Sequence, residues 1–137
     1  MLEPKKVKIL SEEKVISLHK LMAEKTGGDF GLRDIGLLSS ALESAYATFD
    51  GAELYPTIEE KAARIGHSLI ANHAFVDGNK RIGIFILLLF LEVNGYGIHP
   101  TNDEVAKITL SVAAGEGGYE DLLAFIRKHK WWNKTAL

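Results

Sequence analysis

The chain contains no cysteine, only three prolines and no long apolar run. The absence of cysteine excludes a disulfide framework, a thiolate nucleophile and a cysteine-ligated metal site. The longest apolar run, residues 82–91, has about half the length that a bilayer requires. Lys5, Lys6 and Lys8 precede only a short, interrupted apolar stretch, which is too weak for a signal peptide. These absences favour a cytoplasmic protein that does not enter a membrane.

The chain also lacks a clear excess of positive or negative charge. Sixteen Lys and Arg residues against eighteen Asp and Glu residues give a formal net charge of −2. This balance gives no support to a nucleic-acid partner, which would favour a basic surface. A chain of 137 residues is expected to fold as one domain, residues 1–137, because two halves would each be too small to bury a good core.

Apolar residues recur with helical spacing almost throughout the chain, which predicts an all-α fold. Cap residues divide this pattern: Ser11, Asp34, Thr57 and Thr101 are N-cap types, and Gly27, Gly95 and Gly115 are typical helix ends. Thr57 and Thr101 are each followed by Glu three residues later, which is the capping-box pattern. The expected helices cover about residues 11–27, 34–49, 57–73, 79–94, 101–115 and 119–130.

The fourth of these helices is expected to be the centre of the bundle. Residues Ile82–Leu91 are all apolar apart from Gly83, and an amphipathic surface helix would show a polar face. The sequence therefore predicts a helix buried on nearly every side, with the others packed around it.

A dense polar cluster, residues 73–81, leads directly into that helix. Gly78, Asn79, Lys80 and Arg81 would form its N-terminus, where unpaired N–H groups and the helix dipole bind anions. The two cations are unfavourable at this end of a helix unless an anion is bound there. We therefore predict that these four residues bind phosphate groups.

The same cluster holds a base and a metal ligand. His73 is the natural general base, because an unperturbed imidazole titrates close to neutral pH. Asp77 can hold a Mg2+ ion that bridges phosphate oxygens, since Mg2+ takes one or two carboxylates together with substrate phosphates. Phe75 is expected to anchor the loop from below. A base, a metal carboxylate and an anion site in one loop are typical of phosphoryl or nucleotidyl transfer.

The order H-x-F-x-D-G-N-K-R resembles the signature of the Fic/Doc superfamily, and the Lys at its eighth position resembles the Doc (death-on-curing) branch of toxins. The likeness extends from about Ser11 to about Lys130, through residues 27–38 and 54–61. It implies the helical bundle of that superfamily, with ATP and Mg2+ as cofactors.

The resemblance also indicates which group is transferred. Fic enzymes that transfer AMP carry Pro, Gly and a second Arg where this chain has Ala74, Lys80 and Ile84. In the Doc branch these changes accompany an inverted nucleotide and transfer of the γ-phosphate to a protein hydroxyl. The implied target is an elongation factor Tu-like protein, and the implied outcome is arrested translation. AMP transfer is the alternative reaction, and a non-enzymatic nucleotide-binding regulatory module is the alternative class.

The resemblance carries two further expectations. Residues 39–43 match the inhibitory pattern of some Fic proteins only by chance, so an antitoxin protein in trans is expected to silence the toxin. The resemblance suggests that the connection Phe49–Pro56 is the flap that aligns the target over the active site, and a plain inter-helix loop is the alternative.

Three features outside the cluster receive a weaker interpretation. We expect packing or surface roles for His19 and His67. No neighbouring residue in the sequence would complete a catalytic site with His19. The spacing of His67, six residues before His73, does not suit a two-histidine metal pair. Trp131 and Trp132 either attach the tail to the body or offer a surface to a partner.

Overall fold

The computed structural model describes residues 6–132, and these residues form the all-α bundle that the sequence predicts. Two short antiparallel strand pairs accompany the six helices of this part of the chain, β1 with β2 and β3 with β4. The elements are α1 Glu12–Thr26, α2 Ile35–Glu43, a 3-10 turn Ser44–Tyr46, β1 Thr48–Phe49, β2 Ala52–Glu53, α3 Ile58–Asn72, α4 Asn79–Val93, β3 Tyr96–Ile98, α5 Asn102–Ala113, α6 Tyr119–His129 and β4 Lys130–Trp132.

The helices begin where the sequence places their caps. Ser11 and Asp34 accept hydrogen bonds from the backbone N–H groups of Lys14 and Leu37. Thr57 and Thr101 both form complete capping boxes with the glutamates that follow them. These local bonds satisfy N–H groups that have no partner within the helix, so they define where each helix can start.

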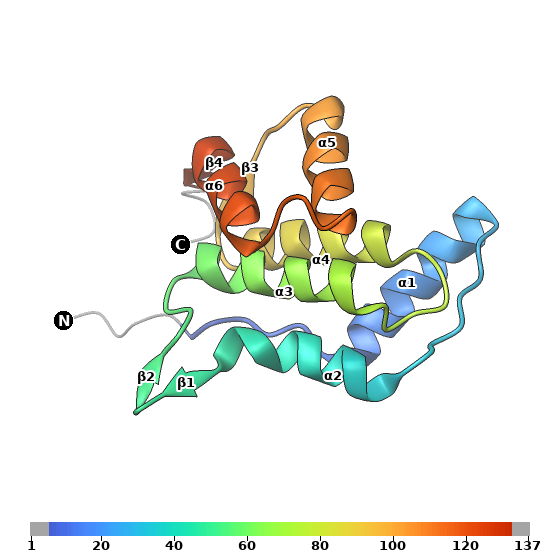
Figure 1. The fold of residues 1–137 in the computed structure, drawn as a ribbon, viewed down its shortest axis with the longest axis horizontal. Helices are drawn as coiled ribbons and strands as arrows, with labels where there is room; N and C mark the ends of the chain where they lie inside the picture. The colour runs from blue at the N-terminus through green and yellow to red at the C-terminus, as the bar shows by residue number, and fades with distance from the viewer. Residues whose placement is uncertain (1–5, 133–137) are drawn as a thin grey trace.

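Helices α3 and α4 lie side by side at the centre of the molecule, with α1 and α2 on one side and α5 and α6 on the other (Figure 1). Their contact is close because glycines face it from both helices. A Cβ on Gly83 would lie 2.5 Å from Ile70 Cγ1, and a Cβ on Gly66 would lie 2.6 Å from Leu87 Cδ1. The two helix axes can therefore approach more closely than larger residues would permit.

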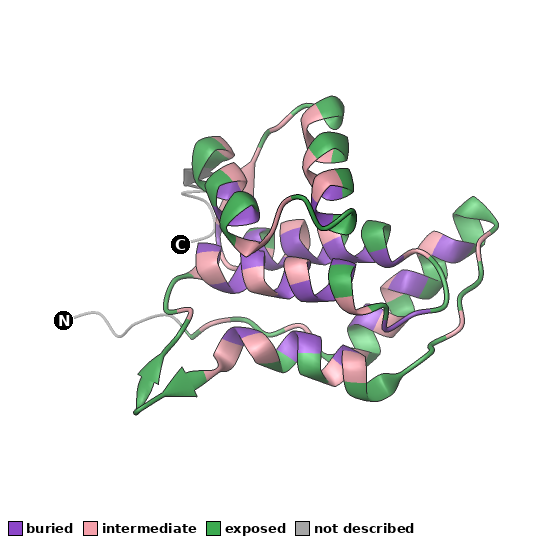
Figure 2. Cartoon of the chain, viewed as in Figure 1, coloured by how far each residue is buried: buried purple, intermediate pink, exposed green. Residues whose placement is uncertain are grey.

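The central role predicted for residues 82–91 is confirmed. Ile82, Ile86, Leu87 and Phe90 are fully buried, and Figure 2 shows buried residues concentrated where α4 meets α3. The outer face of α4 is less covered than predicted, since Phe85 retains 38% of its exposure. Helix α3 is central as well, because it packs against α2, α4, α5 and α6.

The second helix is shorter than the sequence predicts. It ends at Glu43, and Phe49, the last residue of the predicted helix, lies in β1 with 74% of its surface exposed. Asp50 and Gly51 both have positive φ and connect β1 to β2, which is the turn that Asp-Gly favours in tight hairpins. The hairpin is tied to α3 by the buried ammonium group of Lys61, which bonds Glu53 at 2.9 Å and the Tyr55 carbonyl.

The end of the described chain returns to the body. Strand β4 pairs antiparallel with β3 and places Trp131 opposite Gly97 and Trp132 opposite Tyr96. The side chains of both tryptophans lie outside the described part, so the interpretation of their roles stays open. Within residues 6–132, no helix is both long and apolar enough to span a membrane.

Candidate active site

His73 lies at the C-terminal end of α3, where the chain turns towards α4. Its backbone has φ 56 and ψ 51, a left-handed conformation that side-chain-bearing residues seldom adopt. The guanidinium group of Arg33 donates to the carbonyl of His73 at 2.7 Å and to that of Asn72 at 3.4 Å. Arg33 thus satisfies carbonyls that the helix end leaves free and stabilises the turn that presents the exposed imidazole.

The loop after His73 is held from inside by Asn79. The Asn79 side chain accepts from the Phe75 N–H and donates to the Phe75 carbonyl, both at 3.0 Å, and it is only 8% exposed. The sequence predicts that Asn79 is one of the phosphate-binding residues. Its side chain is instead engaged with the loop, so only its backbone N–H at the first turn of α4 remains for an anion.

The buried ring of Phe75 rests on His19 of α1. The two rings stack with centroids 3.8 Å apart and planes 13° from parallel. His19 Nε2 also donates to the Asp77 carbonyl at 2.7 Å. The packing role expected for His19 is confirmed, but the statement that it lies near no site is wrong. It supports the loop from below, across a separation of 58 residues that the sequence pattern does not reveal.

The outer side of the loop is paired with residues 28–34. Leu32 forms an isolated antiparallel bridge with Phe75, and Val76 donates to the Gly31 carbonyl at 3.0 Å. The N–H groups of Arg33 and Asp34 both donate to the Ala74 carbonyl. The loop is therefore bounded by α1 below and by an extended segment beside it.

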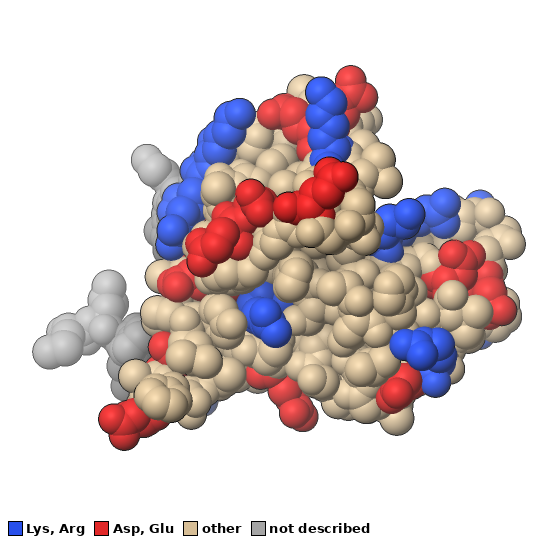
Figure 3. All heavy atoms as spheres, in the orientation of Figure 1, with Lys and Arg blue, Asp and Glu red and all other residues tan. Residues whose placement is uncertain are grey.

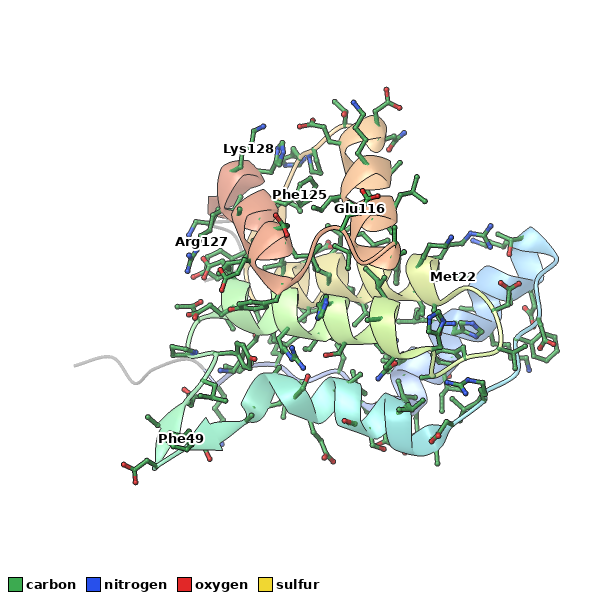
Figure 4. All side chains as sticks on the ribbon, in the orientation of Figure 1. Met22, Phe49, Glu116, Phe125, Arg127 and Lys128 are labelled. Carbon is green, nitrogen blue, oxygen red and sulfur yellow. The ribbon has the colours of Figure 1, made fainter. Side chains whose placement is uncertain are left out.

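This arrangement corrects the position expected for the flap. The hairpin of residues 48–53 adjoins the N-terminal end of α3, whereas His73 caps the other end, about 22 Å away along a 15-residue helix. Figure 4 shows Phe49 on this hairpin, far from Met22, which lines a small pocket beside the loop. Residues 28–34, and not Phe49–Pro56, therefore border the loop.

The exposed groups of the loop meet in one groove of about 590 Å³. All six residues predicted as site residues line it: His73, Asp77, Gly78, Asn79, Lys80 and Arg81. Thr26, Gly27, Gly28 and Val76 complete the wall. Thr26 accepts from Arg81 Nη1 at 3.2 Å, so the end of α1 belongs to the site. The Gly27-Gly28 pair is the sequence signal for that contribution: it predicts a helix end and belongs to the Doc-like residues 27–38, but neither observation predicts a contact with Arg81.

The start of α4 offers an anion site in this groove. Gly78 occupies the N-cap with φ 77 and provides no capping side chain, and no acidic residue lies in the first turn. The first N–H groups of a helix lack partners within it and carry the positive end of the dipole. Figure 3 shows basic side chains gathered where α4 begins beside α1. Lys80 and Arg81, both exposed, add two positive charges there.

The Asp77 carboxylate is the candidate ligand for Mg2+ in this groove. Its Oδ1 accepts from the Gly78 N–H at 2.8 Å, and a Cβ on Gly28 would lie 2.9 Å from its Oδ2. Glycine at residue 28 therefore leaves space beside this exposed carboxylate oxygen. Within residues 6–132 no group of three or more His, Cys, Asp or Glu side chains could enclose a metal. A single carboxylate suits Mg2+, which keeps waters and phosphate oxygens as its other ligands.

An imidazole, one carboxylate and a cationic helix start, joined by a single short loop, define a site of the Fic type. The chain belongs to the Fic/DOC family, whose model matches residues 9–91. It is 30% identical to "Protein kinase doc" of Escherichia phage P1 over 107 residues, which cover 78% of this chain and 83% of that protein.

A second relative is named "Toxin Doc", from Mycolicibacterium smegmatis. The two chains are 45% identical over 69 residues, which cover 50% of this chain and 53% of that protein. The matched region thus spans about half the length of this relative. Both relatives carry the Doc name, in agreement with the branch that Lys80 indicated.

Replacing Asn79 by Ala should destabilise the fold. The change would leave the N–H and carbonyl of the buried residue Phe75 without partners, at about 1–3 kcal/mol for each group. Urea unfolding of the two proteins would measure the difference. Lys80→Ala is the matched control. Lys80 is the exposed neighbour of Asn79, and removal of its charge from the helix start should leave stability unchanged or raise it by up to about 1 kcal/mol. Equal stability of the Asn79→Ala protein and the wild type would contradict this account of the loop.

Proposed function

We propose that this protein is a Doc-type toxin that transfers the γ-phosphate of ATP to a hydroxyl group of a target protein. The observation that carries the proposal is the single groove in which His73, Asp77 and the start of α4 meet. The name of the phage relative, "Protein kinase doc", supports the choice of reaction. The resemblance to the Doc branch supports an elongation factor Tu-like target in the cytoplasm, with arrested translation as the result.

The second turn of α4 favours phosphate over AMP transfer. Ile84 stands where AMP-transferring Fic enzymes carry their second Arg, and it is half-buried and packs against the core. No guanidinium group can therefore reach the groove from this position. Lys80 instead supplies an exposed cation at the start of the helix, beside Arg81.

The residues of the groove account for the chemical steps. The hydroxyl oxygen of the acceptor attacks the γ-phosphorus while the bond from that phosphorus to the bridging oxygen breaks, and ADP leaves with the electron pair. His73, as a neutral imidazole, accepts the hydroxyl proton, which Lys80 and Arg81 cannot do because both are already protonated. The two cations and the first N–H groups of α4 hold the phosphate oxygens. Mg2+ held at Asp77 would offset the negative charge of the phosphates.

Replacement of the base tests the reaction directly. His73→Ala should lower transfer by about 10²–10⁴-fold, the usual contribution of general base catalysis, and should keep most of the ATP affinity. Bacterial extract incubated with ATP and each protein would be analysed by mass spectrometry for a target that gains one phosphate. A gain of one AMP would favour the alternative reaction, and no gain would favour a non-enzymatic nucleotide-binding module. Transfer by His73→Ala at the wild-type rate would exclude His73 as the base.

Replacement of the carboxylate tests the metal site. Asp77→Ala should bind ATP with an affinity that no longer depends on Mg2+, because the loop's metal ligand is gone. Calorimetric titration with ATP, with and without Mg2+, would measure this. Glu24→Ala removes an exposed carboxylate from α1 outside the groove and should leave the Mg2+ dependence intact. If Asp77→Ala retains Mg2+-dependent affinity, Asp77 is not the ligand.

The toxin proposal includes an antitoxin protein that silences the chain in trans. Expression of the wild-type chain alone should therefore slow bacterial growth, whereas His73→Ala should not. Growth curves and the amount of accumulated protein would be compared for the two. If the wild-type protein accumulates to the level of the variant without a growth defect, the toxin proposal is wrong for that host.

A further inference from the structure

His73 lines a second groove on the side facing α5 and α6. This groove of about 550 Å³ lies between the C-terminal half of α3 and the connection from α5 to α6. His67 and Ala71 join His73 on the α3 side, and residues 112–118 form the opposite wall. Of the residues that line the phosphate groove, it shares only His73. We call it the α5–α6 groove.

The wall of this groove is preformed and has small side chains. Residues 112–118 are Val-Ala-Ala-Gly-Glu-Gly-Gly. The N–H groups of Ala114, Gly115, Glu116 and Gly117 donate to carbonyls of residues 110–112, and Gly118 donates to Asp121. Gly115 adopts φ 78, so the turn itself requires this glycine. The wall therefore has a fixed backbone and little side-chain bulk.

Two residues of the α5–α6 groove also border a second depression on α3. His67 and Ala71 line a further depression of about 260 Å³ between α2 and α3, whose remaining lining includes Ser40, Ser44 and Ser68. Burial and the nearby Arg64 lower the pKa of His67, so this histidine is uncharged near neutral pH. This second depression is lined mainly by small or uncharged side chains, and Arg64 is the one cationic residue of its described lining.

The α5–α6 connection carries negative charge. Glu116 lines the groove and is labelled on this connection in Figure 4. Figure 3 shows further acidic side chains along the same edge, where Glu120 and Asp121 begin α6. A segment that lies in the groove would place a basic side chain favourably opposite Glu116.

We propose that the α5–α6 groove holds the acceptor: an extended segment of the target protein whose hydroxyl reaches His73 and whose neighbouring basic side chain faces Glu116. The inference rests on the proposed transfer to a protein hydroxyl. A general base must lie about 2.6–3.2 Å from the hydroxyl that it deprotonates, so the acceptor has to approach His73. The phosphates occupy the groove on the side of Asp77 and Lys80, and the α5–α6 groove provides the second approach to the same imidazole.

Blocking the groove with a side chain tests this assignment. Ala71 is exposed on α3, so Ala71→Phe should fold normally and fill the groove. Ala106→Phe is the matched control at an exposed position of α5 outside the grooves described above. Each protein would be incubated with bacterial extract and ATP labelled on its α- or γ-phosphate, and its affinity for ATP with Mg2+ would be measured by calorimetry.

Ala71→Phe should lower the transfer of label by about tenfold or more, as expected for the loss of one well-packed contact. Its ATP affinity should remain that of the wild type, and Ala106→Phe should match the wild type in both measurements. Glu116→Lys should lower transfer in the same way, with Glu92→Lys on α4 as its charge-matched control.

Unchanged transfer by Ala71→Phe would overturn the proposal, and so would an equal loss of ATP affinity. Unchanged transfer by Glu116→Lys would overturn the claim that a basic side chain of the acceptor faces Glu116. If Ala71→Phe instead converts a dimer to a monomer with unchanged transfer, the groove binds a second copy of the chain. If it abolishes neutralisation by a co-expressed partner with unchanged transfer, the groove binds the inhibitor. A wild-type protein that binds ATP but labels nothing would refute the proposed function itself. Failure of the groove assignment alone gives a different result, because the wild type and Ala71→Phe then label the target equally.

Discussion

The paired hydrogen bonds between Asn79 and Phe75 are the constraint on which the site depends. They close the loop between α3 and α4 from inside, at a position where both partners are buried. Buried polar groups contribute most when every donor and acceptor is satisfied, and their loss costs most for the same reason. With Phe75 fixed, the loop can present His73, Asp77 and the start of α4 outward while its floor stays apolar. The stacked ring of His19 and the strand-like segment 28–34 then hold this loop from two sides.

The close contact of α3 and α4 sets the distance across the groove. His73 ends one helix and the cationic turn begins the next, so the packing of these two helices fixes the imidazole relative to Lys80 and Arg81. Gly66 and Gly83 permit that packing, and each would clash with the opposite helix if it carried a Cβ. A functional site built on rigid helices is held more accurately than one built on a free loop. Here the apolar centre of the bundle provides that rigidity.

The sequence predicted what local chemistry determines. The caps at Thr57 and Thr101, the buried helix after residue 81 and the order of polar residues in the loop depend on neighbours within a few positions. The sequence did not predict contacts between distant segments, such as those of His19 and Arg33 with the loop. A histidine on an amphipathic helix looks the same whether its ring meets solvent or Phe75. The error at Phe49, which was predicted as helical, has a similar origin. Helical spacing of apolar residues continues through Ala45, whereas Asp50 and Gly51 favour a hairpin. The spacing alone does not show that Phe49 is exposed on that hairpin.

Apart from Asp77, no acidic residue of the described chain lines the groove, so a bound anion would offset the charges of Lys80 and Arg81. Lys80 and Arg81 stand at the positive end of α4, and Gly78 provides no acceptor to offset them. Each charge there opposes the helix dipole, by a few tenths of a kcal/mol to about 1 kcal/mol at an exposed position. A bound phosphate reverses the sign of both contributions and adds charge-assisted hydrogen bonds. Because a ligand that binds only the folded state stabilises it, the same arrangement that weakens the free helix start strengthens the complex. The cationic turn at the start of α4 is thus the part of the groove that the proposed phosphate ligand would stabilise most.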